Sequence, residues 1–207
     1  MSRRSTRGSS LEPLTIVNPA PTLALVDYDS LVNGPYSASA YDDAAELLWS
    51  IVSNAVTPKV SESAIHEVTC RLYGGWNAAD GTPTEHRAWM LRSLKTLRGL
   101  RKGIRLVPTI ADSLLVAPSL RLDGTYNNRR QKMTDAMLSI DAMSSLRTKD
   151  HSSLVIVSDD DDFVPVVLTI SVERLGWVCW IRQRAAAAND RHFDRDRIEL
   201  LRELAWT

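Results

Sequence analysis

The chain has 207 residues, of which 44% are hydrophobic and 24% charged, and its 25 basic and 25 acidic side chains give no net charge. This size and composition are typical of one soluble globular domain. They exclude a membrane-spanning helix, because no apolar run approaches the roughly 20 residues that one needs. They also exclude a uniformly basic surface, so that any affinity for nucleic acid must come from a local patch.

The ends of the chain and its cysteines indicate a cytoplasmic protein. Residues 1–18 are basic and contain no apolar run of signal-peptide length, and we interpret them as a flexible tail. The remainder, 19–207, shows no internal repeat or linker and is predicted to be a single domain. Cys70 and Cys179 each lie in an apolar stretch, which indicates buried thiols in a reducing compartment.

Strand and helix patterns alternate along the chain. Apolar runs bounded by turn residues predict strands at 23–26, 64–73, 103–108, 153–158 and 176–181. Apolar stripes at helical spacing predict helices at 41–56, 84–99, 130–147, 162–175 and 194–205. The segment 113–117 could add an edge strand. This alternation favours an α/β fold, a three-layer α/β/α sandwich with a mainly parallel central sheet.

Carboxylates follow two of the predicted strands. Four consecutive aspartates, 159–162, directly follow the fourth strand, and Asp27 and Asp29 close the first. Ligands of open α/β sheets bind at the carboxyl ends of the strands. Crowded carboxylates repel one another unless a cation neutralises them, and hard divalent cations prefer such oxygen ligands. The pattern therefore predicts one acidic pocket that holds a divalent metal ion.

Helix capping is the alternative for some of these acids. An aspartate between a strand and a helix often accepts hydrogen bonds from the first N–H groups of that helix. This role suits Asp29 and Asp162, although it does not account for four aspartates in succession. Asp135 lies near the start of the helix at 130–147, where a solvated acid gains from the helix dipole and from Lys132 three residues earlier.

Three blocks of sequence carry a family resemblance. They are LVDYDSL at 25–31, QKMTD at 131–135 with Leu138 beyond it, and VSDDDDFVP at 157–165. The blocks resemble those of the NYN domain family, PIN-like nucleases that include the bacterial LabA group. In that family a strand ends Asp-x-x-Asn-Leu, a helix starts Lys-Gly-x-Asp-x-x-Leu, and a further strand ends Ser-Gly-Asp-x-Asp-Phe-x-Pro. The resemblance spans residues 22–182, and its last block is the most specific.

The resemblance implies a PIN-like, Rossmann-like topology and a metal-dependent ribonuclease. The acidic catalytic and metal-binding positions of the family fall on Asp27, Asp135, Asp160 and Asp162, and its post-strand hydroxyl falls on Ser158. Bound Mg²⁺ or Mn²⁺ would activate water for in-line attack on an RNA phosphodiester, leaving a 5′-phosphate and a 3′-hydroxyl. Asp27 and Asp160 are the expected principal ligands. Asp135 and Asp162 would bind a second ion or hold a water molecule.

Three residues depart from the family pattern. Ser30 stands in place of the usual Asn, and Met133 and Asp159 replace glycines. Ser30 would make a shorter polar contact with the ligand or substrate, and Asp159 adds negative charge beside the site. Because all four acids of the family site are present, the sequence favours a working site.

Substrate contacts are expected from basic and aromatic side chains near the acids. Arg71 and Tyr73 leave the second predicted strand on one edge of the sheet. Arg129, Arg130 and Lys132 precede the acid at position 135. Arginine and lysine can bind phosphate, and aromatic rings can stack on bases, so RNA is the expected partner.

The other aromatic and basic residues are interpreted as structural. Tyr36, Trp49 and Trp89 take positions typical of the core, whereas Trp76 fits either the core or base stacking. The arginines of 182–197 are interleaved with aspartates, which favours a solvated, self-paired face. The six tryptophans allow a homo-oligomer or a protein partner, but the sequence locates no interface.

Two other function classes stay open on the sequence alone. Asp27 and Asp29 imitate the Asp-x-Asp of haloacid-dehalogenase phosphatases, but Leu31 stands where that family favours Thr or Val. The other class is a PIN-like module that binds RNA or a protein with little turnover, which Ser30 and the neutral net charge support. RNA cleavage that EDTA abolishes would identify the nuclease, whereas turnover of small phosphomonoesters alone would identify the phosphatase.

Overall fold

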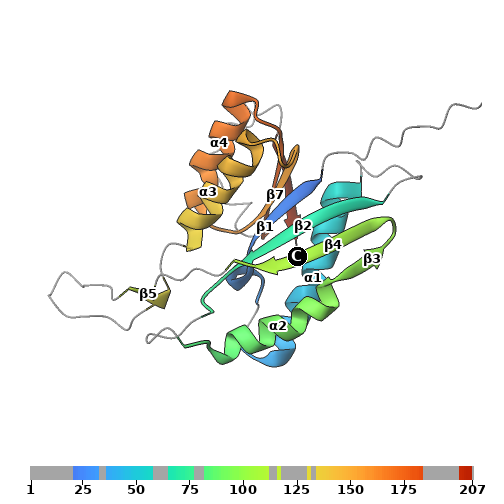
Figure 1. Cartoon of the computed structure of the whole chain (residues 1–207), viewed down its shortest axis with the longest axis vertical. Coiled ribbons are helices and arrows are strands. Elements are labelled where there is room, and N and C mark those ends of the chain that lie inside the picture. Colours follow the sequence, from blue (N-terminus) through green and yellow to red (C-terminus); the bar gives the residue numbers. More distant parts are fainter. Residues whose placement is uncertain are drawn as a thin grey trace, which may run out of the picture.

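A seven-stranded sheet organises the part of the chain that the computed structural model describes, which is residues 21–32, 36–57, 65–76, 82–111, 116–117, 130–131, 134–183 and 201–206 (Figure 1). In spatial order the strands are β3 (Gly99–Arg101), β4 (Ile104–Ile110), β2 (His66–Tyr73), β1 (Thr22–Asp27), β7 (Ser153–Val157), β8 (Trp177–Gln183) and β9 (Leu201–Trp206). Among the described strands of this sheet, only β3 and β4 pair antiparallel. Two short strands, β5 (Val116–Ala117) and β6 (Arg130–Gln131), pair separately.

The strand order reverses beside β1. The chain adds β2 and β4 on one side of β1, and then returns to add β7 and β8 on its other side. In the register, Val26 of β1 lies opposite Leu72 of β2 and Val157 of β7, so that the three strands end together. A reversal of this kind opens a crevice at the carboxyl edge of a parallel sheet, where ligands of such folds bind.

Helices cover both faces of the sheet and so complete an α/β/α sandwich (Figure 1). The α1 (Ala38–Val56) and α2 (Glu85–Leu97) helices pack on one face, and α3 (Thr134–Arg147) and α4 (Val164–Glu173) pack on the other. Successive side chains of a strand point to opposite faces. Ala24 and Val26 therefore join the core beneath α1, whereas Leu23 and Leu25 join the core beneath α3 and α4.

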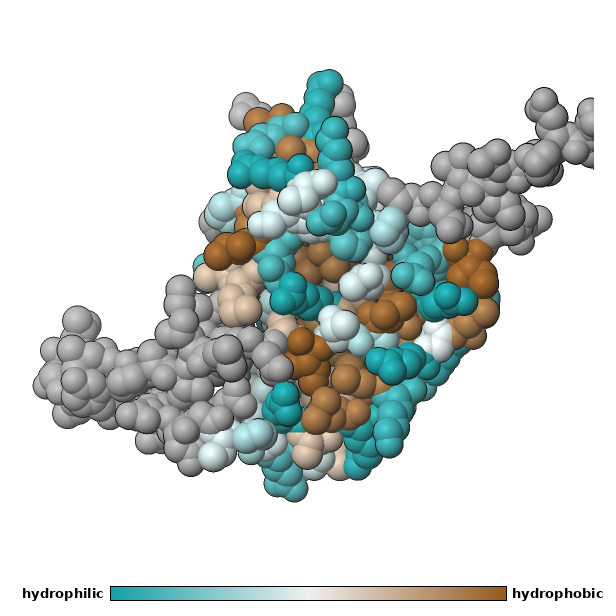
Figure 2. Space-filling model, viewed as in Figure 1, coloured by the Kyte–Doolittle hydropathy of each residue, from teal (hydrophilic) through white to brown (hydrophobic). Residues whose placement is uncertain are grey.

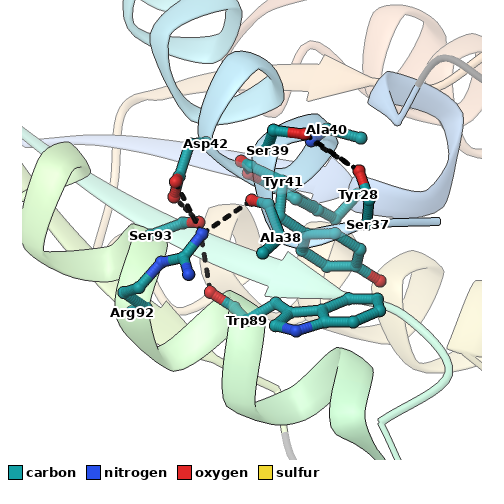
Figure 3. A network of polar contacts seen from close by, with 10 residues as sticks. All are labelled: Tyr28, Ser37, Ala38, Ser39, Ala40, Tyr41, Asp42, Trp89, Arg92 and Ser93. Carbon is teal, nitrogen blue, oxygen red and sulfur yellow. Dashed lines mark hydrogen bonds and ion pairs between the residues drawn. The ribbon is translucent and has the colours of Figure 1, made fainter.

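Polar contacts fix the start of α1 against α2. Ser37 caps α1 by accepting the N–H of Ala40 at 3.2 Å. Arg92 of α2 donates to the Ala38 carbonyl at 2.8 Å and to the Asp42 carboxylate at 2.6 Å, as Figure 3 shows. Ser93 donates to the other oxygen of Asp42 at 3.0 Å. These contacts fix the start of α1 against α2.

The predicted α/β/α sandwich with a mainly parallel sheet is confirmed, but one predicted helix is wrong. Residues 201–206 form β9, which pairs in parallel with β8 through the register Val178 to Leu201. The segment LRELAW consists mostly of helix-forming residues, and pairing with a remote strand overrides that weak local preference. The rest of the predicted helix, 194–200, and the predicted tail at 1–18 lie outside the described residues.

Smaller differences concern the sheet edges and the core. The antiparallel strand β3 was not expected, and only 116–117 of the predicted edge strand is described as a strand, which pairs with β6 rather than with the main sheet. Cys70 and Cys179 are buried and unbridged, as expected. None of the described helices is long and apolar enough to cross a membrane.

Candidate functional site

Asp27 and Ser158 meet where β1 and β7 end. One oxygen of Asp27, Oδ2, accepts the hydroxyl of Ser30 at 2.5 Å and the hydroxyl of Ser158 at 3.1 Å. Ser158 is buried, and its own N–H donates to the Ile181 carbonyl of β8 at 3.2 Å. The two hydroxyls therefore hold the Asp27 carboxylate in one orientation at the crevice. The substitution of Asn by Ser at position 30, which departs from the family pattern, keeps a donor to this acid.

The environment of Asp27 favours its neutral form. Burial raises the pKa of the Asp27 carboxyl, the hydroxyls of Ser30 and Ser158 oppose that rise, and the negative charge of Asp160 adds to it. A carboxylate that is desolvated and repelled by a second carboxylate gains from a cation placed between the two. The effect of Asp160 on this pKa also means that the two acids lie within electrostatic reach of each other.

The loop after β7 folds around Asp160. The hydroxyl of Ser158 accepts the Asp160 N–H at 3.1 Å, and Asp160 Oδ1 accepts the Asp162 N–H at 2.9 Å. Asp160 thereby caps the short 3-10 turn η3 (Asp161–Phe163) that leads into α4. The sequence suggested that Asp162 takes the capping role, and this is wrong, because Asp162 donates its N–H to the cap and its side chain is exposed.

Asp29 lies at the site, where the sequence predicted either a member of the acidic pocket or a helix cap. Its carboxylate accepts the Gly75 N–H at 3.3 Å, which connects the loop after β1 to the end of β2. Burial raises the pKa of Asp29, the Gly75 N–H opposes this, and the charges of Asp27 and Asp135 raise the pKa further. The sequence feature that indicated this position is the spacing of two residues between Asp27 and Asp29.

Asp135 occupies the first turn of α3, as predicted, and is partly buried. Its influence on the pKa of Asp29 places it within electrostatic reach of the same pocket. Across the described ranges, however, no three acidic, histidine or cysteine side chains converge closely enough to hold a metal ion in their present rotamers. The donors are carboxylate oxygens, which suit a hard cation, but at least one side chain would have to rotate before three of them met.

Arg182 holds the acidic loop, residues 159–162, in place. Arg182 is only 3% exposed, and its guanidinium donates to the Asp159 carbonyl at 2.8 Å and to the Asp161 carboxylate at 2.7 Å. It stacks 4.4 Å above the ring of Trp180, whose indole N–H donates to the Ser158 carbonyl at 3.0 Å. The expectation of a solvated basic face is therefore wrong for Arg182. The alternating charges of the sequence did not indicate this role, because one partner of Arg182 is a backbone carbonyl, which a charge pattern does not reveal.

Arg71 and Tyr73, predicted to contact substrate, both bind Asp141 of α3. Arg71 forms an ion pair with the Asp141 carboxylate at 2.9 Å, and the Tyr73 hydroxyl donates to it at 2.5 Å. The ring of Tyr73 is buried, which does not favour direct stacking on a base. Arg71 is partly exposed and lines a hollow of about 440 Å³ with Thr69 and Thr109. Figure 2 shows hydrophilic and hydrophobic residues intermixed on the face of the molecule drawn in Figure 1.

The other predicted contacts divide into described and undescribed residues. Arg129 and Lys132 lie outside the described residues, and only the backbone of Arg130 is described, in β6. Trp76 is fully buried in the core beneath α1, which confirms the structural alternative for it. Tyr36 was expected in the core, but its side chain is 50% exposed, because it precedes the cap of α1 and packs on His86 at the surface.

Comparison with known proteins gives one family match. The family model of the NYN domain matches residues 31–191, which is more than half of the chain, although Asp27 and Asp29 precede the matched residues. No match was found among the curated proteins. A solved structure of a protein of unknown function from Vibrio parahaemolyticus is 14% identical, with a TM-score of 0.48, and the alignment covers 91% of this chain and 93% of that one.

Proposed function

Because the chain belongs to the NYN domain family, whose members are generally PIN-like nucleases, we propose that it is a metal-dependent ribonuclease that hydrolyses RNA phosphodiester bonds. The observation that carries this proposal is the meeting of Asp27 and Asp160 around Ser158, at the reversal of strand order. The acids that we assign to the site are Asp27, Asp135, Asp160 and Asp162.

Mg²⁺ or Mn²⁺ is the proposed cofactor. We assign Asp27 and Asp160 as the principal ligands, because they lie at the ends of adjacent strands and their charges interact. When bound, the ion would activate a water molecule and offset the charge that develops on the phosphodiester. Asp135 and Asp162 would supply further oxygens. Asp29 is a fifth carboxylate within electrostatic reach of Asp27 and Asp135.

The chain itself supplies the orientation of these ligands. Ser30 and Ser158 both donate to Oδ2 of Asp27, which fixes the plane of that carboxylate. Asp160 uses Oδ1 to accept the Asp162 N–H, and this contact fixes its loop. We propose that substrate phosphates are bound by Arg71, Arg129 and Arg130, with Lys132 in support, since arginine and lysine bind phosphate and reduce the repulsion between carboxylates and RNA.

A cleavage assay with one matched pair of variants tests this function. The purified chain is incubated with an end-labelled single-stranded RNA and Mn²⁺, with EDTA as the control. Asp160→Asn should lose cleavage by orders of magnitude, because a ligand of the ion that activates water is lost. Asp159→Asn, one residue earlier in the same loop, should cleave at nearly the parent rate. Equal cleavage by Asp160→Asn and the parent would overturn the proposal.

A second function is favoured by one observation. Because no three of the described acids converge in their present rotamers, a PIN-like module that binds RNA with little turnover is the alternative. The same assay separates the two, since this alternative gives a retarded RNA band that Mn²⁺ does not convert to product.

A further inference from the structure

Three aromatic rings stack from the core outward on the α1–α2 side of the sheet. The ring of Trp89 lies 5.6 Å from that of Tyr41 in the core. His86 stacks on Trp89 with centroids 5.3 Å apart and planes at 22°, and Tyr36 lies 4.7 Å from His86 at 31°. We call Tyr36, His86 and Trp89 the ring column. It ends in solvent at Tyr36, whose side chain is half exposed.

The ring column is held in place before any ligand arrives. His86 and Trp89 are three residues apart on α2, so that they lie on one side of that helix. Tyr36 immediately precedes Ser37, the cap of α1, and the start of α1 is bonded to Arg92 and Ser93 of α2 (Figure 3). A ring that is already oriented loses little conformational entropy when it binds, which increases the affinity that each contact gives.

The ring column stands beside the acidic pocket. Tyr28, which separates Asp27 from Asp29 in the sequence, lies 5.7 Å from the ring of Tyr41, and Tyr41 lies 6.4 Å from Tyr36. The charges of Asp29 and Asp27 add to the effect of burial in raising the pKa of the Tyr36 hydroxyl. The exposed ring and the carboxylates therefore occupy one rim of the molecule.

An exposed aromatic ring beside a phosphodiester site suits a nucleobase. Every base has a flat π surface, and stacking on an aromatic side chain stabilises it without reading its sequence. In a duplex both surfaces of each base are already stacked, so that a ring on the protein gains contact only after the base is displaced. A phosphate that enters the pocket would bring the base attached to it within reach of this rim.

We propose that Tyr36 stacks on a nucleobase adjacent to the phosphodiester in the acidic pocket and so positions the RNA. This inference rests on the proposed nuclease function and adds a substrate-positioning residue to it. Tyr36 acts through its ring, which stacks on the base, whereas its hydroxyl has no part in the contact.

Binding and cleavage are measured separately to test the inference. A short single-stranded oligoribonucleotide that carries 2-aminopurine is titrated with protein in Ca²⁺, and fluorescence quenching reports stacking of that base. Tyr36→Ala should weaken binding by about 5- to 150-fold, the range for one stacked base, and should abolish the quenching. Tyr36→Phe should retain both. Leu100→Ala, an exposed apolar residue on β3 that lies outside this rim, should behave as the parent.

The possible outcomes separate the stacking contact from the nuclease proposal. Equal affinity and quenching for Tyr36→Ala and the parent would refute the stacking contact, as would parent binding to duplex that is as tight as binding to single strands. An absence of any RNA binding by the parent would refute it too, and would make a protein the better candidate occupant of the rim. If the parent binds single strands through Tyr36 but cleaves no RNA in Mn²⁺, the nuclease proposal fails while the stacking contact stands.

Discussion

Replacement of Arg182 by Met should loosen the acidic loop and thereby reduce both stability and cleavage. Arg182→Met removes the hydrogen bond to the Asp159 carbonyl, the ion pair with Asp161 and the stacking on Trp180. A hydrogen bond from a charged donor contributes about 1.5–3 kcal/mol, and a cation over an indole ring about 0.5–2 kcal/mol. The ion pair adds at most about 1 kcal/mol, because the Asp161 side chain is 60% exposed and water screens it.

The desolvation of the guanidinium offsets part of this sum, and Met restores some of the apolar packing. We therefore expect a loss of about 2–3 kcal/mol in the free energy of unfolding. For a domain of this size, 1 kcal/mol corresponds to about 2–4 °C in Tm, so that Arg182→Met should melt about 4–12 °C below the parent. Asp161→Asn, which removes only the exposed ion pair, should melt within about 4 °C of the parent.

Thermal unfolding followed by circular dichroism measures both variants, and cleavage is then compared well below the lower Tm. Arg182→Met should cleave about 100-fold more slowly, since a displacement of about 1 Å in a catalytic group has this effect and Asp160 lies within the loop. Asp161→Asn should cleave at nearly the parent rate. The reasoning about Arg182 is wrong if Arg182→Met melts and cleaves as the parent does, or if both variants lose the same stability.

Three further outcomes follow from the site and its surroundings. Asp27→Asn should melt above the parent at pH 7. Because the pKa of Asp27 is raised in the folded state, the folded parent binds this proton more tightly than the unfolded chain does, and the parent loses stability as the pH rises from the unfolded pKa through the folded pKa. The difference in Tm should vanish below about pH 4, where Asp27 is protonated in both states. Mg²⁺ should raise the Tm of the parent by mass action, and this rise should be lost in Asp160→Asn. Gly74→Ala should destabilise by about 1–3 kcal/mol in urea unfolding, because its Cβ would lie 2.8 Å from the Trp76 ring. Gly75→Ala, whose nearest contact is 3.9 Å away, should unfold near the parent midpoint.

The sequence predicts the centre of this fold better than its edges. The strands β1 and β7 are buried on both faces, so that each is an uninterrupted apolar run that ends at an acid. Within the described sheet, the edge strands β3 and β9 have only one neighbour each. Their conformation depends on a partner strand more than on local preference, and a sequence pattern of period two or 3.6 does not encode that partner.

The site shows the same limit at the level of single residues. Asp27 and Asp160 could be predicted from the ends of adjacent strands, and Ser158 from its place before the acidic run. The role of Arg182 could not be predicted, because its partners include a loop carbonyl and a ring that only the fold brings near it. Tyr36 was taken for a core residue, since the identity of an aromatic residue does not show which of its surfaces is covered.

The hydrogen bond between Ser158 and Asp27 joins positions 131 residues apart, which has a consequence during synthesis. A ribosome that has released β1 to β4 has made only one wall of the acidic crevice, without the loop of Asp160. The loop becomes anchored only after β8 has emerged with Trp180 and Arg182. We therefore expect the proposed ribonuclease activity to be absent from a nascent chain, even toward the messenger that encodes it, until nearly the whole domain has been translated and folded.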